Sequence, residues 1–183
     1  MRVLPLHARS REANLGVLRS LARYLGAEVR NPKWTSYGAI EVDVFTRSRE
    51  DFSLLEAAIR PVMRIEFTHD LEEPARYLPD KDAVELARSY FNAERFWECH
   101  EVLEGMWRRA EGEEKSFLQG MILIAAAYVH GQKEEPKIAV GILRRALPKL
   151  RWSSGDYYGI DVNALTSATA LAVKDNRLQP LTI

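Results

Sequence analysis

The chain has 183 residues, of which 46% are hydrophobic and 28% are charged, a composition typical of globular proteins. Lys+Arg and Asp+Glu both number 26, so no overall positive charge points to nucleic acid or anionic lipid as a partner. The single cysteine, Cys99, excludes an intramolecular disulfide and fits a reducing, cytoplasmic location. The most apolar run, residues 121–129, is shorter than the ~20 residues that a membrane-spanning helix needs. We therefore expect a soluble cytoplasmic protein with neither a nucleic-acid partner nor a membrane span.

The first seventy residues alternate between the strand period and the helix period. Strands are predicted at residues 2–8, 27–35, 39–45 and 63–68, where apolar and polar side chains tend to alternate. Helices are predicted after Asn14 and Ser48, which are typical N-cap residues, and Gly26 should end the first of them. The order β-α-β-β-α-β predicts a ferredoxin-like sandwich, with two helices on one face of a four-stranded antiparallel sheet.

The pattern changes at "LEEPARYLPDKD", where two prolines and several acidic residues show no periodicity. Every later segment has the helical period, and five helices are predicted, at residues 82–93, 96–110, 113–132, 136–150 and 161–174. The fourth should end or kink at Pro148. Their short connections indicate antiparallel neighbours in a compact bundle. The predicted fold class is therefore α+β, with a ferredoxin-like domain at 1–73, a linker at 74–80 and an all-α bundle at 81–183.

A histidine and three glutamates lie on the second bundle helix, in "FWECHEVLEGMW" (residues 96–107). With about 100° of rotation per residue, His100 falls within the apolar arc of this helix and Glu104 lies beside it. Glu101 stacks one turn before Glu104, at the border of the core. Glu98 points away from the apolar arc, so we expect it to lie nearer to solvent.

The third bundle helix, "FLQGMILIAAAYVHG", is apolar nearly all round, and its strongly polar residues are Gln119 and His130. Because a buried polar group without a partner costs about 1–3 kcal/mol, both should find partners on the preceding helix. If these two helices form a hairpin that turns near Gly112, Glu104 lies level with Gln119. His100 and His130 then differ by roughly 9 Å along the axis, which is too far for both to bind one metal ion.

These residues leave three readings open: a structural hydrogen-bond network, a ligand pocket with Trp97 and Trp107 as walls, or a catalytic or metal site. The Glu-x-x-His order of di-iron bundles is absent, and the zinc-protease motif is absent because Glu104 stands where its second histidine would be. We therefore predict no metal ligands, and the residues identify no cofactor. Cys99 is most simply a small buried side chain.

Three stretches, "YFNAERFWECHEVLEGMW", "FLQGMILIAAAYVHGQ" and "AVGILRRALPKL", resemble the family catalogued as domain of unknown function 309. The resemblance covers roughly residues 82–151 and implies a small helical bundle, but no activity. It also implies a small residue, often glycine, where this chain has Glu94. The recurrent polar and aromatic positions of the family fall on Phe91, Asn92, Glu98, His100, Glu101, Glu104, Trp107, Gln119, Gly120 and His130.

The leading hypothesis is a non-enzymatic binding or interaction protein for an unknown small ligand or protein partner. Its pocket would be lined by His100, Glu101, Glu104, Gln119 and His130, with Trp97 and Trp107 as walls. The alternative is a metal-assisted hydrolase or other enzyme that uses Glu101 or Glu104 as general base and His100 as ligand or acid. Because ferredoxin-like sheets often associate through their exposed faces, a homodimer is a further hypothesis.

Overall fold

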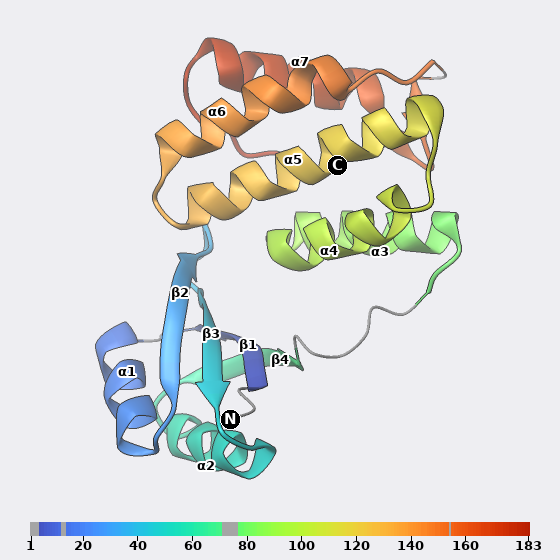
Figure 1. Ribbon diagram of the computed structural model, residues 1–183. Helices are drawn as coiled ribbons and strands as arrows, with labels where there is room; N and C mark the ends of the chain where they lie inside the picture. Colours follow the sequence, from blue (N-terminus) through green and yellow to red (C-terminus); the bar gives the residue numbers. More distant parts are fainter. Residues whose placement is uncertain (1–3, 12–13, 71–76, 154) are drawn as a thin grey trace. The chain divides into compact units, whose positions relative to one another are not determined.

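The computed structural model describes residues 4–11, 14–70, 77–153 and 155–183. The chain divides into two compact units, Met1–Pro74 and Ala75–Ile183, each with its own hydrophobic core. Residues 74–76 of the predicted linker lie outside the described residues. Figure 1 shows strands and helices in the first unit and mostly helices in the second, so the α+β class is confirmed.

The N-terminal unit contains a four-stranded antiparallel sheet with the strand order β2-β3-β1-β4. Its strands are β1 (Leu4–Arg11), β2 (Glu28–Trp34), β3 (Ile40–Thr46) and β4 (Arg64–Asp70). Its helices are α1 (Leu15–Tyr24) and α2 (Arg49–Ile59). The six elements follow one another in the predicted order (Figure 1).

Both predicted helix caps of this unit are confirmed. The Asn14 side chain accepts hydrogen bonds from the backbone N–H groups of Gly16 and Val17, at 2.9 and 3.2 Å. The Ser48 hydroxyl accepts one from the N–H of Asp51 at 3.1 Å. These bonds satisfy N–H groups that a helix leaves without a partner in its first turn. Gly26 follows α1 with φ of +73°, a conformation that glycine adopts without strain.

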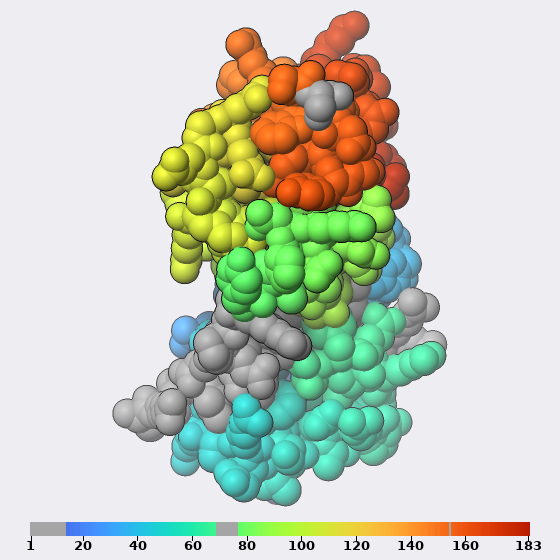
Figure 2. Space-filling model, turned by 90° about the vertical axis from the view of Figure 1, so that its right-hand side faces the viewer, coloured from blue at the N-terminus to red at the C-terminus, as the bar shows by residue number. Residues whose placement is uncertain are grey.

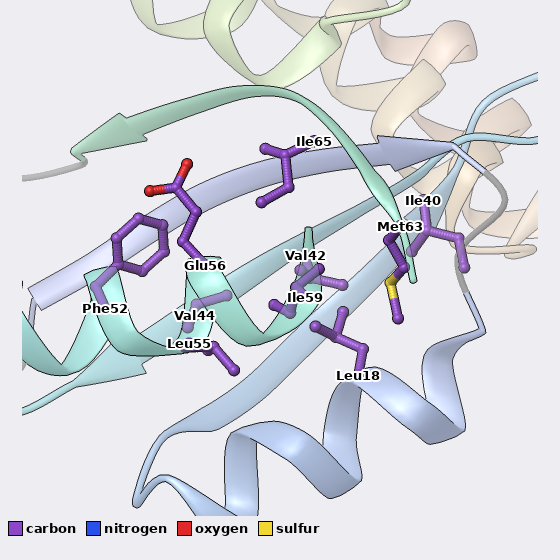
Figure 3. A pocket seen from close by; sticks show the side chains of 10 residues that line it. All are labelled: Leu18, Ile40, Val42, Val44, Phe52, Leu55, Glu56, Ile59, Met63 and Ile65. Atoms are coloured by element: carbon purple, nitrogen blue, oxygen red, sulfur yellow. The ribbon is translucent and has the colours of Figure 1, made fainter. Parts of the chain in front are cut away.

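The core of the N-terminal unit lies between the two helices and one face of the sheet. Leu18 of α1 and Leu55 of α2 are buried against Val42 and Val44 of β3. A cavity of about 20 Å³ remains there, and Figure 3 shows apolar side chains around it with Glu56 as the single charged one. This volume is close to that of one water molecule, so the cavity gives no room for a larger ligand.

The second unit is the helical unit, and all five of its predicted helices are present. They are α3 (Asp80–Asn92), α4 (Phe96–Trp107), α5 (Gly112–Gln132), α6 (Pro136–Ala146) and α7 (Val162–Lys174). The fourth ends at Ala146, close to Pro148, where it was predicted to end or kink, and continues as the 3₁₀ turn η1 (Leu147–Lys149). Pro148 accounts for this end, because proline donates no backbone hydrogen bond.

Helix α5 lies between α4 and α6 at the centre of the helical unit (Figure 1). Phe117, Ala125 and Ala127 are fully buried along it. A Cβ built on Gly120 would come within 2.8 Å of the Leu150 side chain, so a larger residue here would require Leu150 to shift. In the part of the chain that the structure describes, no helix is both long and apolar enough to cross a membrane.

A short hairpin that was not predicted, β5 (Asp156–Tyr157) and β6 (Ile160–Asp161), precedes α7. It lies beside the N-terminal half of α5 on the face shown in Figure 2. Tyr157 packs on Phe117 and donates a hydrogen bond to Glu114 at 2.7 Å. Burial, together with this carboxylate, raises the pKa of Tyr157 well above its usual range.

Candidate functional site

Four of the predicted site residues form the more exposed side of α4. Trp97 is 38% exposed, and its indole stacks on the imidazole of His100 with ring centroids 5.6 Å apart and planes 7° apart. Glu104 follows His100 by one helical turn, and its Oε1 lies 3.9 Å from His100 Nε2. This distance is too long for a hydrogen bond, but the two side chains form an ion pair whenever the imidazole is protonated. Glu101 is half-buried.

The inner edge of this side of α4 carries two buried nitrogen atoms without hydrogen-bond partners, His100 Nδ1 and Trp107 Nε1. The ammonium group of Lys115, in the first turn of α5, lies 4.9 Å from the centroid of the Trp107 ring. Buried polar side chains in folded proteins are nearly always hydrogen-bonded, to protein groups or to ordered water. Each of the two nitrogen atoms therefore has capacity for one further hydrogen bond.

The position of Glu98 differs from the one predicted from the sequence. It was expected to lie nearer to solvent, but the residue is only 3% exposed. Its Oε1 accepts hydrogen bonds from Arg95 Nε and Nη2 at 3.0 and 2.8 Å. The guanidinium also lies over the Tyr90 ring, 4.4 Å from its centroid. The expectation was wrong because α3 packs on α4 as well, and Arg95, three residues earlier, supplies the opposite charge.

Gln119 and His130 are each held by a residue outside the predicted cluster. Gln119 Oε1 accepts a hydrogen bond from Lys149 Nζ at 2.7 Å. His130 Nδ1 lies 2.5 Å from Glu135 Oε2, at the end of α5. Gln119 and His130 are eleven positions apart, about 16 Å along the helix axis, and each has its own partner, so they do not belong to one cluster. The candidate site is therefore confined to α4 and the start of α5.

A second polar cluster joins the turn between α3 and α4 to the end of α5. Gln132, which is 6% exposed, donates a hydrogen bond from Nε2 to the backbone carbonyl of Glu94 at 2.8 Å. Gln132 Oε1 and Glu98 Oε2 are buried without hydrogen-bond partners. Glu94 has a φ of +57°, which explains why a small residue suits this position. The pattern of apolar residues gave no sign of this cluster, because Gln132 lies at the helix end.

Neither a thiol nucleophile nor a metal cluster is evident at this site. Cys99 is fully buried, and this burial, with the nearby charge of Glu98, raises the pKa of its thiol above the usual range. The thiol therefore stays protonated near neutral pH and is a poor nucleophile. Across residues 4–11, 14–70, 77–153 and 155–183, no group of three or more His, Cys, Asp or Glu side chains is placed to hold a metal ion.

Comparison with known proteins places the helices of the candidate site within a described family. Residues 84–142 match the family model described as "Domain of unknown function (DUF309)", and this stretch includes all the predicted site residues. A conserved hypothetical protein from Thermus thermophilus has a crystal structure with 33% sequence identity to this chain. The match covers 54% of this chain and 99% of that chain, with a TM-score of 0.44. No protein of curated function gives a significant match.

Proposed function

The chain belongs, through its helical unit, to the DUF309 family, and we propose that it is a non-enzymatic binding protein whose ligand site is the more exposed side of α4. The supporting observation is the set of buried polar atoms without partners. Among the described residues there are four such atoms, and two of them, His100 Nδ1 and Trp107 Nε1, belong to this side of α4. Because leaving such an atom without a partner costs about 1–3 kcal/mol, a ligand that supplies the missing bonds gains this energy on binding.

The α4 side chains define the chemistry of this ligand. Trp107 Nε1 is a hydrogen-bond donor only, so the ligand must present an acceptor atom to it. The nearby ammonium of Lys115 favours an anionic acceptor, such as a carboxylate, over a neutral carbonyl. The Trp97 indole, 38% exposed and stacked on His100, suits contact with a planar ring. A small aromatic or heteroaromatic carboxylic acid combines these features.

The ligand also has to fit the length of the site. The ring would stack on Trp97 and the carboxylate would meet Trp107, ten residues later, which corresponds to about 15 Å along the axis of α4. A ring and a carboxylate linked by a chain of several carbon atoms span this distance. Glu104, 41% exposed at its side chain, lies between them, so the part of the ligand that passes it should carry no negative charge.

An NMR screen of small aromatic carboxylic acids tests this function. The four tryptophans, Trp34, Trp97, Trp107 and Trp152, each give one indole N–H signal in a ¹⁵N-labelled sample. A ligand at the proposed site shifts the signals of Trp97 and Trp107. Trp34 lies on β2, and Trp152 Nε1 already donates to the carbonyl of Asp156 at 2.9 Å, so both signals serve as internal controls.

Two outcomes of the screen decide the proposal. Acids that shift the Trp97 and Trp107 signals, and lose this effect in His100→Phe, support it. This substitution keeps a ring that can stack on Trp97 but removes both ring nitrogens. The exposed α3 substitution Glu85→Gln is the matched control and should leave binding unchanged. Compounds that shift all four signals equally, or bind His100→Phe as well as the wild type, would contradict the proposal.

For the N-terminal unit we propose the ferredoxin-like sandwich. Its support is the strand order β2-β3-β1-β4, with every neighbouring pair antiparallel, together with the order β-α-β-β-α-β along the chain. Both helices contribute to the core on the side of Val42 and Val44 of β3. This fold is shared by proteins of many unrelated functions, so it adds no activity to the proposal for α4.

A further inference from the structure

The proposed ligand site forms one stripe along α4. Four side chains lie on it at steps of three, four and three residues: Trp97, His100, Glu104 and Trp107. At about 100° of rotation per residue, these positions fall within roughly 80° of the helix circumference. A molecule that lies along this stripe, with its ring on Trp97 and its acceptor at Trp107, therefore passes directly over Glu104.

The Glu104 carboxylate can accept further hydrogen bonds. Its Oε2 accepts one from Arg108 Nη2 at 3.3 Å, and its Oε1 lies 3.9 Å from His100 Nε2. Within the part of the chain that the structure describes, no protein donor lies within hydrogen-bond distance of Oε1. The Arg108 side chain is 73% exposed, and exposed ion pairs of this kind contribute little free energy. Glu104 is therefore open to a cationic donor carried by a ligand.

A positive charge lies near the end of the same stripe. The Lys115 ammonium is 4.9 Å from the centroid of the Trp107 ring, and Lys115 is half-buried. Among the described residues, no carboxylate lies within ion-pair distance of this ammonium. Glu104 precedes Trp107 by three residues, which corresponds to about 4.5 Å along the axis of α4. The site thus presents one negative and one positive group, neither of them firmly paired, close to each other.

This pair of charges matches an amino acid, whose ammonium and carboxylate groups are bonded to the same carbon atom. With the carboxylate at Trp107 Nε1 and Lys115, the ammonium of such a ligand lies beside Glu104. Trp97 precedes Glu104 by seven residues, which corresponds to about 10 Å along the helix axis. The ring that stacks on Trp97 is therefore separated from the amino-acid group by a long chain.

We propose that the ligand of this site is an amino acid with a long uncharged side chain that ends in an aromatic ring. This ligand class rests on the function proposed for α4, and it adds an ammonium group with Glu104 as its partner. Hydrogen bonds between an ammonium and a carboxylate are about twice as strong as those between neutral groups. The site therefore binds the amino acid more tightly than the same acid without its amino group.

Three compounds that differ by one group each test this preference by isothermal titration. Nε-benzoyl-lysine carries the ring, the ammonium and the carboxylate, ε-benzamidocaproic acid lacks the ammonium, and N-benzoylcadaverine lacks the carboxylate. The wild type should bind Nε-benzoyl-lysine about fivefold more tightly than ε-benzamidocaproic acid, the value for a partly exposed charge pair. Glu104→Gln should abolish this preference, whereas the matched control Glu85→Gln, on the exposed side of α3, should keep it. Lys115→Met should weaken the binding of both acids.

The results separate the ligand class from the function on which it rests. If the wild type binds the two acids equally, or if Glu104→Gln keeps the preference, the ammonium does not meet Glu104 and the ligand class is wrong, while the binding of aromatic acids at α4 is unaffected. Both acids should shift the indole N–H signals of Trp97 and Trp107. If none of the three compounds shifts these signals, or if N-benzoylcadaverine binds as tightly as Nε-benzoyl-lysine, both the ligand class and the proposed function are overturned.

Discussion

Removal of the Arg95 guanidinium should destabilise the helical unit strongly. Arg95 donates two hydrogen bonds to Glu98 Oε1, at 3.0 and 2.8 Å, and the Glu98 side chain is only 4% exposed. Breaking a buried ion pair costs about 3–5 kcal/mol, because the remaining charge is left buried without its partner. The Arg95 side chain is 21% exposed, so water reaches part of the pair and lowers the cost. We expect Arg95→Met to lower the free energy of unfolding by about 3 kcal/mol.

A double-mutant cycle separates this charge effect from lost packing. Glu98→Leu removes the buried carboxylate, so Arg95→Met should cost much less in its presence. The coupling free energy is then about 1–3 kcal/mol. Urea unfolding followed by far-UV circular dichroism measures it, because most of the helical signal comes from α3–α7. A cost of Arg95→Met below about 1 kcal/mol, the value for exposed pairs, or additive effects of the two substitutions, would refute the reasoning.

Two further predictions concern a turn and the response to pH. Glu94→Gly should raise the free energy of unfolding by about 0.5–1 kcal/mol, because φ is +57° at this position. Glu85→Gly, within α3, should lower the free energy of unfolding by about 1 kcal/mol. If both substitutions lowered it, the positive φ at residue 94 would not explain the effect of glycine there. Burial and Glu114 raise the pKa of Tyr157, so the unfolded chain loses this proton first and stability falls as pH rises through about 10. Between about pH 8 and 10.5, the free energy of unfolding measured with urea should fall less in Tyr157→Phe than in the wild type. An equal fall in both proteins would contradict this cause.

The sequence predicted those features that depend on local pattern. Asn14 and Ser48 cap helices as expected, because their bonds reach only three residues along the chain. The five helices of the helical unit follow from apolar periodicity. Pro148 was predicted to end or kink the fourth helix of the bundle, and α6 ends at Ala146, two residues before it.

The partners of polar side chains could not be predicted, because they depend on how several helices pack. A single helical projection gives Glu98 a solvent-facing direction, but α3 covers that direction and Arg95 neutralises the charge. His130 was expected to find a partner on the preceding helix, but it pairs with Glu135, five residues further along the chain. The packing of Leu178 on the core of the helical unit could not be predicted from the periodicity of apolar residues, because residues 178–183 adopt no regular structure.

The affinity of an aromatic carboxylic acid found by the screen, compared between the wild type and Trp107→Phe, tests the central claim most directly. This substitution keeps an aromatic ring over the same core but removes the buried Nε1 donor that has no partner in the free protein. Isothermal titration should show binding weakened about tenfold, which corresponds to the loss of one hydrogen bond of about 1.4 kcal/mol. Equal affinity for both proteins would show that the buried nitrogen does not contact the ligand, and would contradict the proposed site on α4.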